Sequence, residues 1–244
     1  MIEITIDNQK CSVEKGTTIL EAAKSLGVKI PTLCYHEALP PDGNCRLCQV
    51  EVEERGRRKL VIACMYPVRG PIAVFTDTEK VRKARKFIIQ LLLNRSPEAP
   101  VLKELASEYG VEPLDERFGK DRDLCIRCTR CVRACAILGN NCLSMVMRGW
   151  EREPSSAFRE APPDCIGCGA CAEVCPTGMI IMDEHDSIRE IWGRKFELVA
   201  CERCGEFFAT REQLEKASEE PKADDLNICP RCRKRLEAER IRIT

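Results

Sequence analysis

Alternating apolar and polar residues mark two short strands at the start of the chain. Ile2, Ile4 and Ile6 alternate with polar neighbours, and a second alternating stretch begins at Cys11. A period of two is typical of a strand with one buried face. The pattern therefore predicts a β-rich N-terminal domain.

A capping box predicts a short helix after these strands. Thr18 is followed three residues later by Glu21, and Gly27 is a stop signal. Strand alternation returns at residues 49–53, and residues 78–93 have helical periodicity. We expect the N-terminal domain to end where this longer helix begins.

The first half of the longer helix is basic. Its cationic residues are Lys80, Arg82, Lys83, Arg85 and Lys86. Such a tract is usually a solvated helix face, and the alternative is a surface that docks an acidic partner. A polar connector with one helix at residues 102–109 follows, and residues 192–199 are predicted to form a strand.

Composition narrows the class of protein. The 244 residues carry 39 basic and 39 acidic side chains, so the net charge is zero and the basic footprint of a nucleic-acid binder is absent. No apolar run approaches the roughly 20 residues of a membrane span. The N-terminus lacks the apolar region of a signal peptide, so the 18 cysteines are interpreted as metal ligands in a cytoplasmic protein.

One cysteine pattern occurs twice. Each repeat has three cysteines separated by two residues and a fourth after three more: Cys125, Cys128, Cys131 and Cys135, then Cys165, Cys168, Cys171 and Cys175. This is the bacterial two-cluster ferredoxin pattern, in which the fourth cysteine binds the other cluster. The predicted [4Fe–4S] ligands are Cys125, Cys128, Cys131 and Cys175 for the first cluster, and Cys165, Cys168, Cys171 and Cys135 for the second. Two zinc sites, the alternative, would not need the fourth cysteine.

The surroundings of these cysteines agree with that interpretation. Gly167 and Gly169 suit a loop whose backbone approaches inorganic sulfide closely. Pro176 follows the last cysteine, whereas Ala136 follows Cys135. The long segment between the repeats is predicted to be a hairpin that covers the clusters, with a substrate site as the alternative.

An N-terminal set of cysteines predicts a [2Fe–2S] cluster. Its members are Cys34, Cys45, Cys48 and Cys64. Three lie on a loop ahead of a strand and the fourth is more distant, which suits a chain that encircles a cluster. A zinc site is the alternative. Ligation by cysteine alone predicts a low reduction potential.

A C-terminal set predicts a zinc-ribbon-like tail. Two Cys-x2-Cys pairs are separated by 24 residues: Cys201 and Cys204, then Cys229 and Cys232. Four thiolates also suit a single iron, and a third cubane is the remaining alternative. Cys11 and Cys142 belong to no set and are interpreted as small buried apolar residues. His36 is either a surface residue or a hydrogen-bond donor near the [2Fe–2S] site.

The order of these sites carries a family resemblance. The segments IPTLCYHEALPPDGNCRLCQVEVE, DLCIRCTRCVRACA and DCIGCGACAEVCPTG resemble the N-terminal part of the complex I large subunit. They resemble still more closely the iron–sulfur diaphorase subunit of NAD-reducing [NiFe] hydrogenases. Two features depart from that family. Residues 91–120 lack its one-histidine, three-cysteine cluster site, and the cysteine-paired tail is an addition.

The predicted fold class is α+β. The expected domains are a β-grasp [2Fe–2S] ferredoxin (1–77), a helical connector (78–120), a bacterial-type 2[4Fe–4S] ferredoxin (121–190) and a zinc-ribbon-like unit (191–244).

The resemblance implies a non-catalytic subunit that relays electrons between a flavoprotein subunit, which binds FMN and NAD(H), and a catalytic subunit such as a hydrogenase or formate dehydrogenase. Alternatives are a subunit of an electron-bifurcating or succinate-dehydrogenase-like reductase, and a metal-stabilised assembly or regulatory protein.

Overall fold

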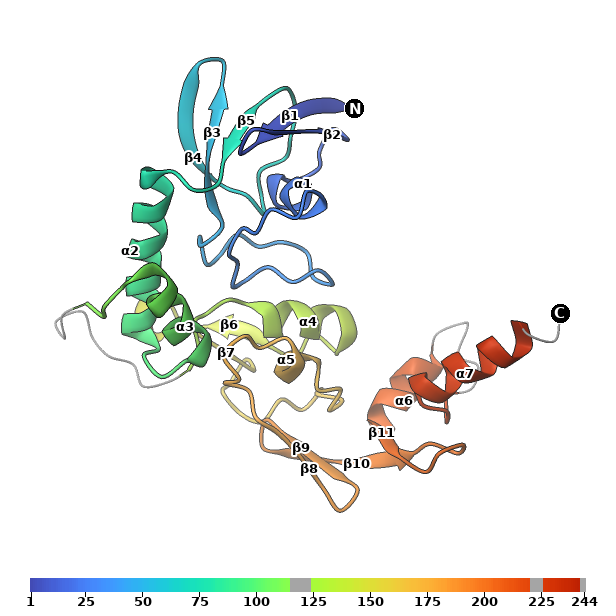
Figure 1. Cartoon of the computed structure of the whole chain (residues 1–244). Helices are drawn as coiled ribbons and strands as arrows, with labels where there is room; N and C mark the ends of the chain where they lie inside the picture. Colours follow the sequence, from blue (N-terminus) through green and yellow to red (C-terminus); the bar gives the residue numbers. More distant parts are fainter. Residues whose placement is uncertain (115–123, 220–225, 242–244) are drawn as a thin grey trace. The chain divides into compact units, whose positions relative to one another are not determined.

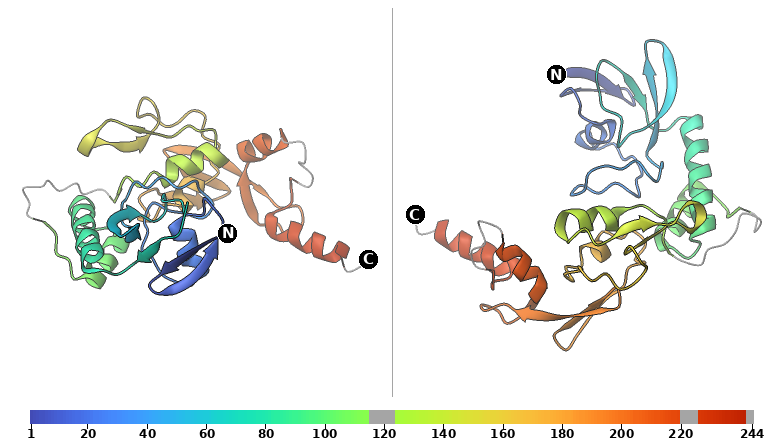
Figure 2. Two further views of the ribbon diagram at one scale, coloured as in Figure 1. Left: turned by 90° about the horizontal axis from the view of Figure 1, so that it is seen from above. Right: turned by 180° about the vertical axis from the view of Figure 1, so that it is seen from behind.

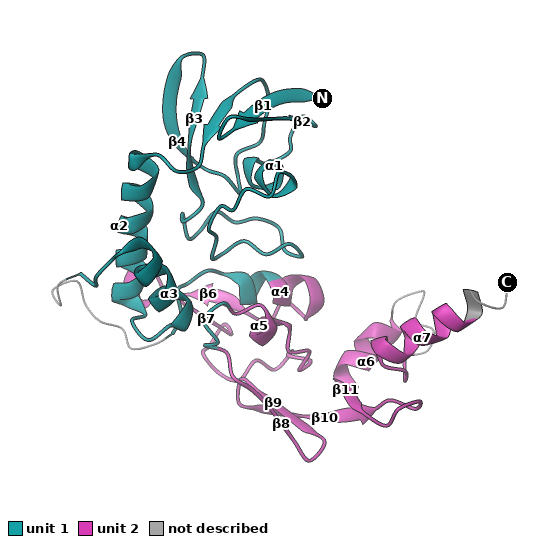
Figure 3. Cartoon of the chain, viewed as in Figure 1, with its two compact units in different colours: residues 1–133, 176–179 teal, residues 134–175, 180–244 magenta. Residues whose placement is uncertain are grey.

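The computed structural model describes residues 1–114, 124–219 and 226–241 (Figure 1). The chain divides into two compact units (Figure 3). The first unit comprises residues 1–133 and 176–179, and the second comprises residues 134–175 and 180–244. The predicted boundary between residues 120 and 121 lies outside the described residues. Within the described ranges, no helix is both long and apolar enough to cross a membrane.

The first unit begins with a five-stranded sheet. Its strands are β1 (Ile2–Ile6), β2 (Gln9–Val13), β3 (Gln49–Glu54), β4 (Arg57–Ile62) and β5 (Ala73–Phe75), in the order β2-β1-β5-β3-β4. β1 pairs with β5 in parallel, and the other pairs are antiparallel. Helix α1 (Ile19–Ser25) contributes to the same core. This arrangement confirms the predicted α+β ferredoxin domain of the β-grasp type.

Local signals place α1 where the sequence predicts it. The Thr18 hydroxyl accepts the N–H of Glu21 at 3.3 Å, and the Glu21 carboxylate accepts the N–H of Thr18 at 2.8 Å. Both halves of the capping box are therefore formed. Ile19 and Ala23 are fully buried. They hold the helix against the apolar strand residues, which are the core of the domain.

The connector consists of helices α2 (Glu79–Arg95) and α3 (Pro100–Tyr109), which pack against each other. Arg85 differs from the expectation of a fully solvated basic face, because only 4% of it is exposed. Its guanidinium donates to the carbonyl of Gln49 at 2.7 Å and lies 3.4 Å from the Tyr109 hydroxyl. Arg85 therefore joins the helices to the strand that follows Cys48. A buried cation needs such partners.

The second unit contains a hairpin, a four-stranded sheet and three helices in addition to the end of α4 (Arg130–Leu138). The hairpin pairs β6 (Ser144–Val146) with β7 (Glu153–Ser155), as predicted for the segment between the repeats. A 3-10 turn, η2 (Gly149–Glu151), lies between its strands. Trp150 in this turn is 44% exposed.

The larger sheet of this unit has the order β11-β10-β9-β8. Its strands are drawn in orange in Figure 2. Its strands are β8 (Met182–His185), β9 (Ile188–Ile191), β10 (Arg194–Ala200) and β11 (Phe207–Thr210). The helices are α5 (Ala170–Glu173), α6 (Arg211–Ser218) and α7 (Pro230–Ile241). β10 overlaps the predicted strand at residues 192–199 but begins two residues later, and it leads directly into the cysteine-paired tail.

Phe196 anchors the second cysteine repeat to this sheet. The side chain is 1% exposed and packs over Gly167, whose φ is +63°. A Cβ at position 167 would lie 2.7 Å from the Phe196 ring. Position 167 therefore requires glycine for two reasons, its left-handed backbone and its close contact with the ring.

We expect Gly167→Ala to destabilise the protein more than Gly193→Ala. Gly193 has a φ of +73° but nothing within 4 Å of its Cβ position, so its substitution measures backbone strain alone, about 1 kcal/mol. The ring contact should add about 1–3 kcal/mol at position 167. Anaerobic thermal unfolding of the two variants measures the difference. Equal melting temperatures would contradict the packing argument.

Candidate metal centres

The four N-terminal cysteines are all buried, at 1–7% exposure. Their side chains influence one another's acidity in two pairs, Cys34 with Cys45 and Cys48 with Cys64. The backbone N–H of Cys45 also points at Cys34 Sγ at 3.4 Å. Each iron of a [2Fe–2S] cluster takes two of its four cysteines. The paired thiols therefore fit such a cluster.

The thiols of this set differ in acidity. The Cys34 contact lowers the pKa of Cys45 to about 7, and the Cys64 contact lowers that of Cys48 to about 7. The pKa values of Cys34 and Cys64 are raised by the same contacts and by burial. Thiolates are the form that binds metal, so a lowered pKa favours ligation. Close by, His36 Nδ1 accepts the N–H of Ala38 at 3.2 Å.

The first cysteine repeat has a left-handed backbone at two positions. Arg127 has a φ of +56° and Thr129 a φ of +63°. Gly167 and Gly169 occupy the matching positions of the second repeat, with φ values of +63° and +75°. Non-glycine residues are strained in this conformation, so their side chains need a function. The sequence shows the two glycines but not that the first repeat shares their geometry.

Hydrogen bonds hold both left-handed positions of the first repeat. The Thr129 hydroxyl donates to Asp42 at 2.6 Å, on the loop between Cys34 and Cys45. Asn44, on the same loop, donates to the carbonyl of Arg127. Both contacts lie within the first unit. They join the [2Fe–2S] loop directly to the loop of the first repeat.

Two arginines of α4 strengthen this junction. Arg133 donates to the carbonyls of Cys34 and Pro40, and its Nη2 lies 3.4 Å from the carbonyl of Cys128. Arg130 donates to the carbonyl of Tyr35. Arg133 thus links a predicted [2Fe–2S] ligand to a predicted cubane ligand. Hydrogen bonds from a charged donor are the stronger kind.

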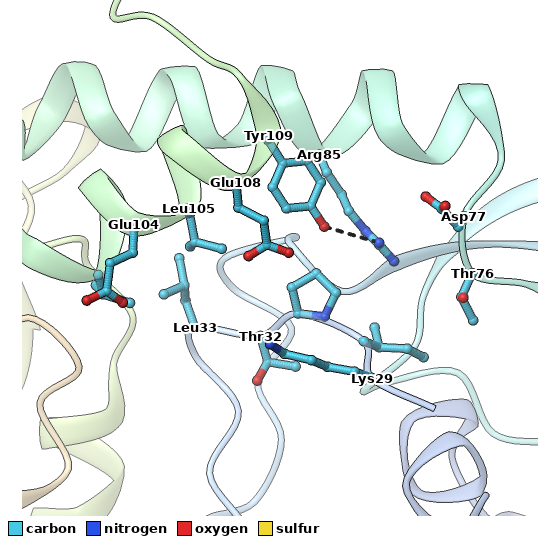
Figure 4. A pocket seen from close by; sticks show the side chains of 13 residues that line it. Lys29, Thr32, Leu33, Thr76, Asp77, Arg85, Glu104, Leu105, Glu108 and Tyr109 are labelled. Carbon is cyan, nitrogen blue, oxygen red and sulfur yellow. Dashed lines mark hydrogen bonds between the residues drawn. The ribbon is translucent and has the colours of Figure 1, made fainter. Parts of the chain in front are cut away.

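A polar cavity of about 600 Å³ adjoins the other side of the [2Fe–2S] loop (Figure 4). It lies between residues 29–33, the start of α2 and the helix α3. Glu104, Glu108 and Lys29 line it together with the Arg85–Tyr109 pair. Its lining includes Leu33, next to Cys34, but none of the predicted ligands.

The second repeat forms a cavity lined by five cysteines. They are Cys135, Cys142, Cys165, Cys168 and Cys171. Four of them are the predicted ligands of the second cubane, so the structure brings Cys135 of the first repeat to the three cysteines of the second. Cys142 is the addition that sequence reasoning missed. It is half-buried, and its Sγ lies 3.5 Å from Cys135 Sγ.

Polar hydrogens surround this cavity. The Gly167 N–H points at Cys165 Sγ, and the Trp192 indole N–H points at Cys171 Sγ, both at 3.4 Å. Two arginines bind carbonyls of the loop: Arg189 binds that of Gly167 at 2.7 Å, and Arg194 binds that of Cys165 at 2.9 Å. Donors to sulfur and nearby cations are the features that suit a bound [4Fe–4S] cluster and tune its potential.

The predicted ligands of the first cubane are Cys125, Cys128, Cys131 and Cys175. The first three belong to the first unit. The assignment of these four cysteines to one cluster stays a prediction. Ser96 in the first unit donates to the carbonyl of Cys125 at 3.2 Å.

The four cysteines of the tail converge. Their sulfurs all lie within 4.8 Å of one another, and Cys204 Sγ and Cys229 Sγ are 3.8 Å apart. A tetrahedral ion with metal–sulfur bonds of about 2.3 Å would place sulfurs about 3.8 Å apart. The backbone N–H of Cys229, 3.2 Å from Cys201 Sγ, is the largest cause that lowers the pKa of Cys201 to about 6. The set therefore fits a single ion better than a cubane, whose thiolates bind four different irons.

Two family models match the chain. A 2Fe-2S iron-sulfur cluster binding domain matches residues 1–79, and a 4Fe-4S dicluster domain matches residues 124–179 and 164–210. The HndD subunit of the NADP-reducing hydrogenase from Solidesulfovibrio fructosivorans is 37% identical over 222 residues, which are 78% of this chain and 37% of that protein. A subunit of the NADH-quinone oxidoreductase from Rhizobium meliloti is 33% identical over 255 residues, 88% of this chain and 29% of that protein.

The chain is a homologue of iron–sulfur subunits of NAD(P)-linked hydrogenases and complex I. A solved structure of an NAD+-reducing [NiFe]-hydrogenase agrees, with a TM-score of 0.62, 26% identity and coverage of 73% of this chain and 86% of that chain. This homologue spans only 37% and 29% of the length of the two curated relatives. The match confirms the predicted resemblance.

We expect Arg133→Ala to slow electron transfer between the [2Fe–2S] cluster and the first cubane. The substitution removes the bonds to the Cys34 and Cys128 carbonyls, at a cost of about 2 kcal/mol, and leaves every thiol in place. Rapid-freeze EPR after mixing with a reductant measures the transfer. Arg69→Ala is the control, because Arg69 is an exposed arginine of the same unit. Equal transfer rates in the two variants would contradict this role.

Proposed function

We propose that the chain is an electron-transfer subunit of a multi-subunit oxidoreductase. It would hold one [2Fe–2S] and two [4Fe–4S] clusters and relay single electrons between a flavoprotein subunit, which binds FMN and NAD(H), and a catalytic subunit. The clusters supply the electron chemistry, while the protein positions them and tunes their potentials. The names of the relatives, all subunits of NAD(P)- or NADH-linked oxidoreductases, support the choice of partner.

One observation carries the proposal. The [2Fe–2S] loop and the loop of the first repeat are joined by hydrogen bonds from Thr129, Asn44 and Arg133 within one compact unit. Electron transfer slows steeply with distance, so a relay needs its centres held close together and fixed. A protein that used its metals only for stability would not need two such loops bonded to each other.

The proposed ligands are those expected from the sequence. They are Cys34, Cys45, Cys48 and Cys64 for the [2Fe–2S] cluster, Cys125, Cys128, Cys131 and Cys175 for the first cubane, and Cys165, Cys168, Cys171 and Cys135 for the second. The paired N-terminal thiols and the cavity of the second repeat support two of these sets.

The tail is proposed to bind zinc and to dock a neighbouring subunit. Its four sulfurs fit one tetrahedral ion, and thiolate ligands hold zinc strongly enough to fold a short segment. Among the described residues, Phe208 and Ile228 are the partly buried apolar residues that pack against the buried cysteines of this site. Such a small apolar core is typical of a metal-stabilised knuckle and offers little cover for a redox centre.

Elemental analysis tests the cofactor content. Anaerobically prepared protein should contain about ten irons and about one zinc per chain, two irons from the [2Fe–2S] cluster and eight from the two cubanes. Reduced samples should give the EPR signals of all three clusters. Fewer than about six irons at full occupancy would refute the cluster assignments. An eleventh iron without zinc would refute the assignment of the tail.

A double substitution tests the tail and the partners together. Cys201→Ala with Cys229→Ala should abolish zinc binding and weaken recovery of partner subunits, while the EPR signals of the three clusters persist. The measurement is an anaerobic pull-down from the native host with identification of the bound proteins by mass spectrometry. Arg203→Ala is the control, since it removes the exposed pair with Glu239 and leaves all four thiols in place.

Two results would count against the proposal. Loss of an iron signal in the double variant would make the tail an electron carrier. Wild-type protein that recovers no flavoprotein subunit would contradict the proposed relay.

A further inference from the structure

The cavity of the second repeat is lined by one cysteine more than a [4Fe–4S] cluster binds. Five cysteines line it, but a [4Fe–4S] cluster takes one cysteine for each of its four irons. The surplus lies in one corner, where Cys135 Sγ and Cys142 Sγ are 3.5 Å apart. Two sulfurs this close together can each reach the same iron, and that iron takes only one cysteine. Cys142 lines the cavity together with Cys165, so it faces into the set and not away from it.

The backbone turns back after α4 and places Cys142 beside Cys135. Helix α4 ends at Leu138, and the N–H groups of Gly139 and Asn141 both donate to the Cys135 carbonyl, at 3.0 and 3.1 Å. Asn141 has a φ of +53°, which reverses the chain. A Cβ at Gly139 would lie 3.1 Å from Cys135 Sγ, so glycine lets the loop close tightly over the sulfur.

Side chains from elsewhere in the second unit hold this loop. Lys216 of α6 donates to the Gly139 carbonyl and to the Asn140 side chain. The Asn140 amide in turn donates to the carbonyl of Asp164 at 3.0 Å, beside Cys165. The position of Cys142 is therefore determined by three connected segments and not by the loop alone.

We propose that Cys142 is an alternative fourth ligand of the second [4Fe–4S] cluster, interchangeable with Cys135. The inference rests on the proposed function, because it presupposes a cubane at this site. In the exchange, the bond between iron and Cys135 Sγ breaks and a bond to Cys142 Sγ forms. One proton passes from the incoming thiol to the released thiolate, and no electron is gained or lost.

The two thiols are already neighbours. Cys135 Sγ and Cys142 Sγ are 3.5 Å apart, and both residues line the same cavity. Because the competing sulfur is already in contact, the exchange requires rotation of two side chains and no rearrangement of the helix.

Three alanine variants test the exchange, since alanine offers no ligand atom. Cys135→Ala and Cys142→Ala should each retain about ten irons and the EPR signal of the second cubane. The double variant Cys135→Ala/Cys142→Ala should lose about three to four irons and that signal. Cys11→Ala is the matched control, a second unassigned cysteine that is also half-buried.

Anaerobic alkylation followed by peptide mass spectrometry reports the ligand directly. Cys142 should be protected from iodoacetamide in Cys135→Ala, and Cys135 should be protected in Cys142→Ala. In the wild type both should be partly labelled, which is the signature of exchange. Labelling of Cys142 alone in the wild type would overturn the proposal.

The iron contents separate the remaining outcomes. If either single variant loses the cluster as fully as the double variant, one cysteine is the sole ligand and the proposal fails. Full iron content in the double variant overturns it as well. Wild-type protein without the eight cubane irons would instead be a failure of the proposed function, and is distinguishable because it precedes any substitution.

Discussion

Convergence of several sulfurs on one small volume is the constraint on which the rest of this structure depends. A chain that places three cysteines around one point must turn with a left-handed backbone between them. Both repeats do so at the same two positions, Arg127 and Thr129 in the first and Gly167 and Gly169 in the second. Neighbouring elements are arranged to stabilise those turns, through hydrogen bonds in one repeat and through packing of Phe196 in the other.

Arginines serve both cysteine repeats in a common way. They bind carbonyl oxygens of the loops, as Arg133 does at Cys128 and Arg194 does at Cys165. A carbonyl held outward by a cation leaves the N–H groups of the loop free to face inward, toward sulfur. The cations also offset the negative charge of a thiolate-bound cluster. The chain is neutral overall, so this positive charge is a local arrangement and not a property of its composition.

Much of the fold and most of the sites follow from sequence because their signals are local. The capping box at Thr18 and the cysteine spacings depend on neighbours a few residues away. The capping box led to a correct prediction, and the spacings predicted the two iron–sulfur domain types that the family models match. Arg85 shows where prediction from sequence fails. Its charge predicted a position on a solvated helix face. The partner that allows its burial, the Gln49 carbonyl, lies 36 residues earlier in the chain. The place of Cys142 in the cavity was not predicted for a similar reason, since only the chain reversal at Asn141 brings Cys142 back to Cys135.

The unequal residues at the left-handed positions also mean that the two repeats have become specialised modules. A second repeat given the arginine of position 127 would force a side chain into the Phe196 ring, because even a Cβ there lies 2.7 Å away. At Gly169 a Cβ would meet the sulfur of Met182 at 2.6 Å. A first repeat given two glycines would relieve its strain but lose Thr129's link to Asp42. The two repeats therefore hold the same backbone turns with different residues and contacts, so the residues at these positions are not interchangeable.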